Sequence, residues 1–395
     1  MLLSKTVNFR LSLFYFFFFA ALGTFVPYWS VYLKSLGFSA VEIGELMAIV
    51  MASKVIAPYF LGWLADHTQK RLIIIQLSSV FTVLVFAGVF IEQSFWWLAL
   101  IMAVFGFFWN ASLPLFESLA LNHLQGDVNR YSHIRLWGSV GFIVLVVLIP
   151  LFINPGDNTT GISSLPALLL LLLMLTGLTT LLITDKGTVV VVHSAQRISQ
   201  LIKSPLVFAF LFACSLQSIS HGAYYTFFSI YLEEHDYSRM MTGWMWGLGV
   251  IAEVLLFIIM HRLLNRFGAC YLFNLALFVT AVRWVVLALW VDSLALLIVA
   301  QCFHAASFGL FHASAIDLIH RLFPGKFQAR GQALYAGLSF GLGGAIGNLM
   351  SGYSWELLGS TWTFLASAMI ALLSAIISVT FVKKGRLPVL AKHVV

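Results

Sequence analysis

The sequence alternates between long runs of apolar residues and short polar or Gly/Pro-rich segments. Each run reaches about the 20 residues that a helix needs to cross the hydrocarbon core of a bilayer. The pattern therefore predicts twelve membrane-spanning helices. We place them at 11–33, 41–65, 72–91, 95–122, 134–153, 164–184, 205–232, 239–260, 269–290, 293–319, 329–353 and 360–382.

Composition supports an all-α membrane protein. Hydrophobic residues make up 61% of the chain and charged residues only 9%, whereas a soluble domain carries about 25% charged residues. This excludes a cytosolic enzyme, a nucleic-acid-binding module and a secreted disulfide scaffold. The 3 cysteines lie in or beside apolar runs without a paired spacing, which indicates packing residues and neither disulfides nor a metal site. We expect no cofactor and no metal.

The positive charges sort to one side of the predicted helices. If the N-terminus is cytoplasmic, the inner segments contain 18 of the 22 Lys and Arg residues, and the outer loops contain only Lys34 and Arg239. Positive charge collects in cytoplasmic loops, so we predict that both termini are cytoplasmic. The formal charge of +7 therefore sets the topology and does not indicate nucleic-acid binding.

Two halves of the sequence repeat each other. The longest polar segment, 185–204, is expected to be a cytoplasmic linker between an N-terminal half, 1–184, and a C-terminal half, 205–395. At an offset of 199 residues, Tyr32 aligns with Tyr231 and Lys54 with Glu253. Parallel six-helix halves with a substrate site between them are typical of secondary transporters.

The segment after the second predicted helix, Gly-Trp-Leu-Ala-Asp-His-Thr-Gln-Lys-Arg at 62–71, resembles a family signature. It is similar to the motif between helices 2 and 3 of the major facilitator superfamily, although His67 replaces the usual Arg. The resemblance implies the two-bundle major facilitator fold and a gate on the cytoplasmic side. The residues that match this gate are Gly62, Asp66, Lys70 and Arg71.

Shorter segments resemble the bacterial phenylpropionate permease family of proton symporters. They lie at 26–34, 135–140, 222–225, 249–253 and 282–284. This resemblance implies a transporter of the bacterial inner membrane that imports an aromatic acid such as phenylpropionate. The partners it implies are the small solute, protons and the lipid bilayer, and it implies a monomer. Other interpretations remain open: a sugar or nucleoside proton symporter, a drug/proton antiporter, or a non-transporting membrane sensor or channel.

A looser likeness to lactose permease concerns proton coupling. An acid in helix 8, an Arg in helix 9 and a His in helix 10 are tied to proton coupling in that permease, and they correspond here to Glu253, Arg283 and His312. A charge at the bilayer centre costs roughly 2.5–3.5 kcal/mol on the insertion scale, so such residues face the bundle interior and pair. Desolvation favours the neutral acid whereas an arginine favours the carboxylate. Glu253 is thus the predicted proton carrier, and the alternative is a permanent Glu–Arg bridge.

The first half contains an analogous mixed pair, Lys54 and Glu117. Lys54 either binds a substrate carboxylate or neutralises Glu117, and the sequence does not decide between them. His304 and His312 lie eight residues apart on one helix, hence ~80° apart around its axis. Each is either a proton relay or a hydrogen-bonded buried histidine. Asp317 lies four residues before Arg321, a spacing that favours a helix-end salt bridge.

The superfamily resemblance implies that helices 1, 4, 7 and 10 line the substrate cavity. Polar and aromatic residues of these helices include Tyr28, Trp29, Asn110, Gln217, His221, Tyr225, Gln301, His304 and Ser307. The residues we assign to substrate binding are Lys54, Asn110, Glu117, His221, Tyr225 and His304. The glycines of helix 11 fit close helix packing better than a nucleotide loop, and Gly343 and Gly347 have the i, i+4 spacing that such packing needs.

Overall fold

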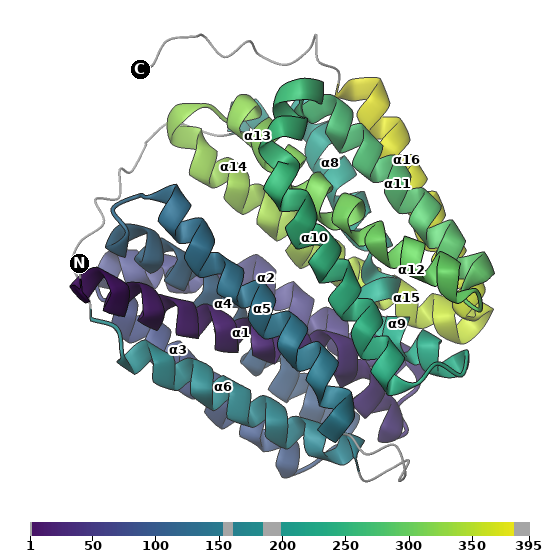
Figure 1. Cartoon of the computed structure of the whole chain (residues 1–395), viewed down its shortest axis with the longest axis horizontal. Coiled ribbons are helices and arrows are strands. Elements are labelled where there is room, and N and C mark those ends of the chain that lie inside the picture. The colour runs from purple at the N-terminus through teal and green to yellow at the C-terminus, as the bar shows by residue number, and fades with distance from the viewer. Residues whose placement is uncertain (1, 153–160, 185–198, 383–395) are drawn as a thin grey trace. The chain divides into compact units, whose positions relative to one another are not determined.

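A computed structural model of the chain describes residues 2–152, 161–184 and 199–382, and every regular element in these ranges is a helix (Figure 1). Most of the predicted linker, at 185–198, lies outside the described residues. The division into halves at that segment stays a prediction.

The first six long helices match the predicted spans in order. They are α1 (Leu2–Ser35), α2 (Ala40–Thr68), α3 (Arg71–Phe86), α4 (Phe95–His123), α5 (Val128–Phe152) and α6 (Leu165–Leu181). The start of α2 follows from its sequence, because Ser39 and Glu42 form a capping box: Ser39 N donates to Glu42 Oε2 at 2.8 Å, and Glu42 N donates to Ser39 Oγ at 3.3 Å. Such a box satisfies two backbone donors that the first turn leaves free.

Later helices are more often interrupted. After the short α7 (Ser199–Ile202) come α8 (Pro205–Ser220), α9 (Gly222–Glu234), α10 (Arg239–Phe267), α11 (Ala269–Trp290), α12 (Leu294–Cys302), α13 (Phe311–Leu322), α14 (Gln328–Tyr335), α15 (Gly344–Leu358) and α16 (Ser360–Phe381). A π-helical segment, Ala305–Leu310, joins α12 to α13, and a second, Ala336–Gly343, joins α14 to α15. The sequence stays apolar through both π-helical segments. α12 and α13 together therefore correspond to one predicted span, and α14 and α15 to another.

Eleven helices in the described ranges are long and apolar enough to cross a membrane. α2 is not among these eleven, and its 29 residues include Glu42, Glu45, Lys54 and Asp66. With α2 included, the structure contains the twelve predicted spans. Helix lengths also follow the sequence repeat, since α2 and α10 both contain 29 residues and start 199 positions apart.

The chain forms two compact units, which we describe separately. Unit 1 comprises Met1–Val192 and Tyr224–Gly247, and unit 2 comprises His193–Ala223 and Leu248–Val395. In unit 1, α1 packs against α5 and α6, and α4 packs against α2 and α3. In unit 2, α16 packs against α8 and α11, and α11 also packs against α13. Many large apolar side chains remain exposed, as expected for helices that face lipid.

Two glycines of unit 2 allow backbones to touch. A Cβ added at Gly347 would lie 2.5 Å from Ile219 O, and one at Gly343 would lie 2.9 Å from Ser215 O. Gly222, which follows the break between α8 and α9, lies against the backbone of Gly347. The predicted close packing of Gly343 and Gly347 is therefore confirmed.

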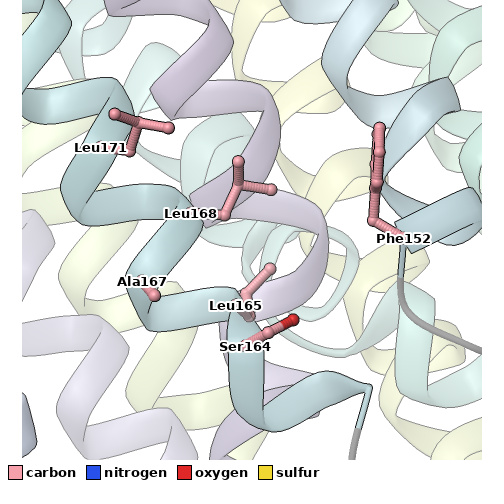
Figure 2. Close-up of a pocket in the computed structure, with 6 residues that line it drawn as sticks. All are labelled: Phe152, Ser164, Leu165, Ala167, Leu168 and Leu171. Atoms are coloured by element: carbon pink, nitrogen blue, oxygen red, sulfur yellow. The ribbon is translucent and has the colours of Figure 1, made fainter.

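An apolar crevice of about 370 Å³ lies between the end of α5 and the start of α6. Figure 2 shows that Phe152, Leu165, Leu168 and Leu171 line it, and Ser164 is the one polar side chain among its described lining residues. The described lining is apolar and offers a polar solute little binding energy. The functional site is better sought among the buried charges.

Candidate functional site

Arg283 on α11 is fully buried in unit 2 and held on several sides. Its Nε donates to Ala300 O at 2.8 Å, and its Nη1 donates to Ser307 Oγ at 2.9 Å. Nη2 lies 3.4 Å from Gln301 Oε1, and the guanidinium carbon lies 4.6 Å from the centroid of the Trp284 ring. A buried cation needs this many partners to offset its lost hydration. The position of the guanidinium is therefore fixed by its surroundings.

A second layer of hydrogen bonds holds the π-helical segment that carries Ser307. Gln217 Nε2 on α8 donates to Thr280 Oγ1 at 2.7 Å and to Ser307 O at 3.0 Å. A π-helical turn changes which carbonyl oxygens are used within the helix, and such turns are frequent at functional sites. Here the carbonyl oxygen of Ser307 accepts a hydrogen bond from Gln217 on α8. Gln217 thereby ties α8 to α11 and to this segment.

His304 lies between Arg283 and Glu253. Its Nδ1 is 3.1 Å from Arg283 Nη1, and its Nε2 is 3.7 Å from Glu253 Oε2 on α10. The side chains of His304 and Glu253 are 7% and 18% exposed. Sequence reasoning expected Glu253 to pair with Arg283, and the structure places the imidazole of His304 next to both groups. The sequence could not reveal this order, because it depends on how three helices are rotated against one another.

The two other histidines of unit 2 occupy different surroundings. His221, at the end of α8, is buried, with its Nδ1 2.8 Å from Gln217 O and its ring edge against Trp284. His312 on α13 lies four residues after Phe308 of the π-helical segment, whose ring is nearly parallel to those of His304 and His312. His312 Nδ1 lies 3.1 Å from the hydroxyl of Tyr335.

Tyr335 is a residue that sequence reasoning missed. It is 1% exposed, and it lies at the end of α14, beside the second π-helical segment. Thr280 was also missed. Both are common in membrane helices, so their type alone gives no signal.

Lys54 is the cation that the sequence places inside a predicted span of unit 1. It lies half-buried on α2, one turn from the buried residues Val50 and Ala57. Asn110 on α4 fixes this part of α2 by donating from Nδ2 to Val50 O at 2.9 Å and to Ser53 Oγ at 2.8 Å. Among the described side chains, no carboxylate forms an ion pair with Lys54.

Glu117 is not the partner of Lys54. Its Oε1 lies 3.4 Å from Arg135 Nε on α5, and the guanidinium of Arg135 lies over the ring of Phe19 at 4.3 Å. The interpretation in which Lys54 neutralises Glu117 is therefore wrong. Tyr225, another substrate candidate, belongs to unit 1 and stacks on Trp246 with ring centroids 6.3 Å apart.

The predicted gate is only partly assembled. Asp66 Oδ1 accepts from Arg71 Nη2 at 2.6 Å, and Arg71 Nη1 donates to Ser118 Oγ at 2.7 Å, which links α2, α3 and α4. Lys70 is exposed at the start of α3, and a Cβ added at Gly62 would meet no atom within 4 Å. At the end of α13, the predicted Asp317–Arg321 ion pair is confirmed, at 2.7 Å.

The two units thus offer different chemistry. Unit 2 provides a carboxyl group that can take up a proton, next to an imidazole and a fixed arginine. Unit 1 provides an ammonium group whose charge no carboxylate of the described chain balances. A cation of this kind can bind an anion, and a buried carboxyl group can carry a proton.

Comparisons with known proteins match most of the chain. The sequence profile described as "MFS_1 like family" matches residues 8–366. The chain is 28% identical over 359 residues to the "Probable 3-phenylpropionic acid transporter" of Escherichia coli (strain K12), covering 88% of this chain and 91% of that protein. It is 28% identical over 353 residues to the maltose permease of Geobacillus stearothermophilus, covering 87% and 86%.

Solved structures extend the likeness to three dimensions. A crystal structure of a mutant of the nucleoside transporter NupG superposes with a TM-score of 0.84, at 17% identity, covering 95% of this chain and 100% of that chain. A bacterial homolog of the lysosomal transporter Spinster, in an inward-facing and occupied conformation, gives a TM-score of 0.78 at 12% identity, covering 96% and 97%. At such low identity these matches show the fold alone, and they confirm the predicted all-α membrane fold.

Proposed function

Because the chain belongs to the MFS_1-like family and is a transporter of the major facilitator type, we propose that it is a proton symporter for a small aromatic carboxylic acid. The first candidate substrate is 3-phenylpropionate, which the name of the Escherichia coli relative contains. The proposal includes import across a bacterial inner membrane by a monomer with both termini in the cytoplasm.

The observation that carries this proposal is the unbalanced charge of Lys54. An ammonium group in the middle of a membrane helix costs roughly 2.5–3.5 kcal/mol on the insertion scale. The described chain supplies no carboxylate to offset that cost, because Glu117 pairs with Arg135. A substrate carboxylate supplies the missing charge. A neutral sugar or nucleoside does not supply this charge, although the relatives include a maltose permease and a "Putative nucleoside transporter".

Proton coupling follows from the charge of such a substrate. Moving a monoanion into a cell against an inside-negative potential costs about 2.3 kcal/mol per 100 mV. Import of the anion with one proton moves no net charge and removes this cost. Import with more than one proton moves positive charge inward, so the membrane potential then drives transport. Glu253 can take up that proton, since its carboxyl group is 18% exposed and next to His304.

The central comparison of the test is between 3-phenylpropionate and a neutral analogue that differs from it only at the carboxylate. Purified protein in proteoliposomes is assayed for binding and uptake of 3-phenylpropionate, with 3-phenylpropanamide as the neutral analogue and maltose and uridine as alternative substrates. We expect saturable uptake of the acid alone. Uptake of maltose or uridine without uptake of any aromatic acid would overturn the proposed substrate class.

A further inference from the structure

We propose that His304 is a positioning residue whose tautomer Arg283 locks, so that its Nε2–H faces Glu253 and the transported proton resides on Glu253 alone. This inference rests on the proposed function, because it concerns how Glu253 takes part in proton coupling. It assigns His304 neither to substrate binding nor to proton transfer.

The tautomer follows from the chemistry of the partner. A guanidinium has five N–H donors and no acceptor, and it does not lose its proton in proteins. Arg283 Nη1 lies 3.1 Å from His304 Nδ1, so this nitrogen must present its lone pair. The proton of the neutral ring is then on Nε2, the nitrogen that lies 3.7 Å from Glu253 Oε2.

Arg283 cannot easily move away to release this lock. Its other donors are bound to Ala300 O, Ser307 Oγ and Gln301 Oε1. A second proton on His304 Nδ1 would place an N–H group against the N–H of a cation. The ring also packs against α10, since a Cβ added at Gly249 would lie 3.4 Å from His304 Cγ and Cδ2.

His221 provides an internal contrast within the same network. Its Nδ1 lies 2.8 Å from the carbonyl oxygen of Gln217, which can only accept. His221 must therefore carry a proton on Nδ1. The two buried histidines of unit 2 are thus held in opposite tautomers, one by a partner that only donates and one by a partner that only accepts.

The titratable and charged groups around His304 come from three helices: Glu253 from α10, Arg283 from α11 and His221 at the end of α8. When Glu253 is ionised, the Nε2–H of His304 can donate to it after a small approach. When Glu253 is protonated, that N–H cannot accept the new proton, so the acid proton must point elsewhere. The Nε2–H of His304 therefore stabilises the ionised form of Glu253.

The direct test is ¹⁵N NMR of histidine-labelled protein in lipid bilayers. Signals are assigned by comparing the wild type with His304→Gln and His221→Gln. We expect His304 to show an unprotonated Nδ1 and a protonated Nε2 from about pH 5 to about pH 8, the range in which an ordinary histidine titrates. We expect His221 to show the opposite pattern. A doubly protonated His304 ring, or an Nδ1–H tautomer, would overturn the proposal.

A transport experiment separates positioning from proton transfer. In His304→Gln, the side-chain amide can still donate toward Glu253, so we expect substrate-driven proton uptake with the wild-type proton-to-substrate ratio. Its rate should fall about tenfold, the effect of weakening one hydrogen bond to a charged group. The shorter amide of His304→Asn does not reach Glu253. This variant should therefore shift the pH profile of transport further than His304→Gln does. Loss of proton uptake in both variants with exchange retained would assign the proton to His304.

The two arms also distinguish failure of this inference from failure of the proposed function. The NMR pattern requires no transport activity. If the wild type takes up substrate without protons, the symport proposal fails, and the role of His304 in proton coupling fails with it. If the wild type couples to protons but the tautomers are reversed, only the inference about His304 fails.

Discussion

Glu117 Oε1 on α4 lies 3.4 Å from Arg135 Nε on α5, and this pairing leaves Lys54 without an acidic partner in the described chain. The sequence repeat makes the asymmetry clear, because Lys54 in the first half corresponds to Glu253 in the second. A cation and an acid at equivalent positions suit different tasks. We assign anion binding to the first and proton uptake to the second.

The surroundings of these two residues diverge in the same way. At the offset of 199 residues, the network residues of unit 2 correspond to three phenylalanines in unit 1. Gln217, His304 and Ser307 correspond to Phe18, Phe105 and Phe108. The hydrogen-bond network around Arg283 is therefore specific to the second half of the repeat.

Lys54→Gln should lower the affinity for 3-phenylpropionate by about 100-fold, since losing a charge-assisted hydrogen bond costs about 3 kcal/mol. Lys54→Arg should retain most of the binding. Equilibrium binding to purified protein measures the effect. Lys34→Gln removes a lysine of the exposed Lys34–Glu234 pair and serves as the matched control. Equal affinities in the Lys54→Gln variant and the wild type would refute the assigned role of Lys54.

Glu253→Gln should abolish uphill, proton-driven accumulation and retain exchange of internal for external substrate. The amide resembles the protonated acid in shape, so the substrate-bound steps can continue while proton release cannot occur. Accumulation and counterflow in proteoliposomes separate the two activities. Glu92→Gln, at an exposed residue, controls for loss of an acid elsewhere. Uphill accumulation by Glu253→Gln would show that another group carries the proton.

Asp66→Asn should lower the thermal stability of the protein. Its partner Arg71 is 15% exposed and also bonded to Ser118, and weakening a partly buried, charge-assisted bond costs about 1–3 kcal/mol. Asp317→Asn breaks the more exposed Asp317–Arg321 pair, where an i, i+4 ion pair contributes about 0.3–0.5 kcal/mol. Thermal melting in detergent should therefore show a larger drop in melting temperature for Asp66→Asn than for Asp317→Asn. Equal melting temperatures would argue against a structural role for the Asp66–Arg71 contact.

Gly347→Ala should reduce the yield of folded protein, because the new Cβ would lie 2.5 Å from the carbonyl oxygen of Ile219. Forcing an extra methyl group into such a contact costs about 1–3 kcal/mol. Gly62→Ala is the matched control, since a Cβ there meets no atom within 4 Å. Size-exclusion profiles after heating measure both. Similar profiles for the two variants would contradict the close contact at Gly347.

Much of the fold was predictable because the bilayer imposes a simple length rule. The apolar run at 95–122 predicts α4, Phe95–His123, almost to the residue. Other ends differ, since α1 begins at Leu2 and not at residue 11. Hydropathy reports where a helix lies in lipid and not where it ends in water. It is also blind to the π-helical segments, because these change hydrogen-bond register without changing composition.

The candidate site was predictable only as a set of residue types. The cost of burying charge selected Lys54, Glu253 and Arg283 from the sequence. Their partners depend on the rotation of each helix, which no periodicity in a uniformly apolar segment records. For that reason the sequence left Lys54 open between a substrate carboxylate and Glu117, and it did not place His304 between Glu253 and Arg283.

The central claim is that an aromatic acid and a proton enter together, and substrate-induced alkalinisation tests it most directly. Proteoliposomes without a membrane potential receive 3-phenylpropionate while the external pH is recorded. We predict an immediate rise in external pH that saturates with substrate and is absent in Lys54→Gln and Glu253→Gln. No rise with any aromatic acid, together with a clear rise on adding maltose or uridine, would contradict the account.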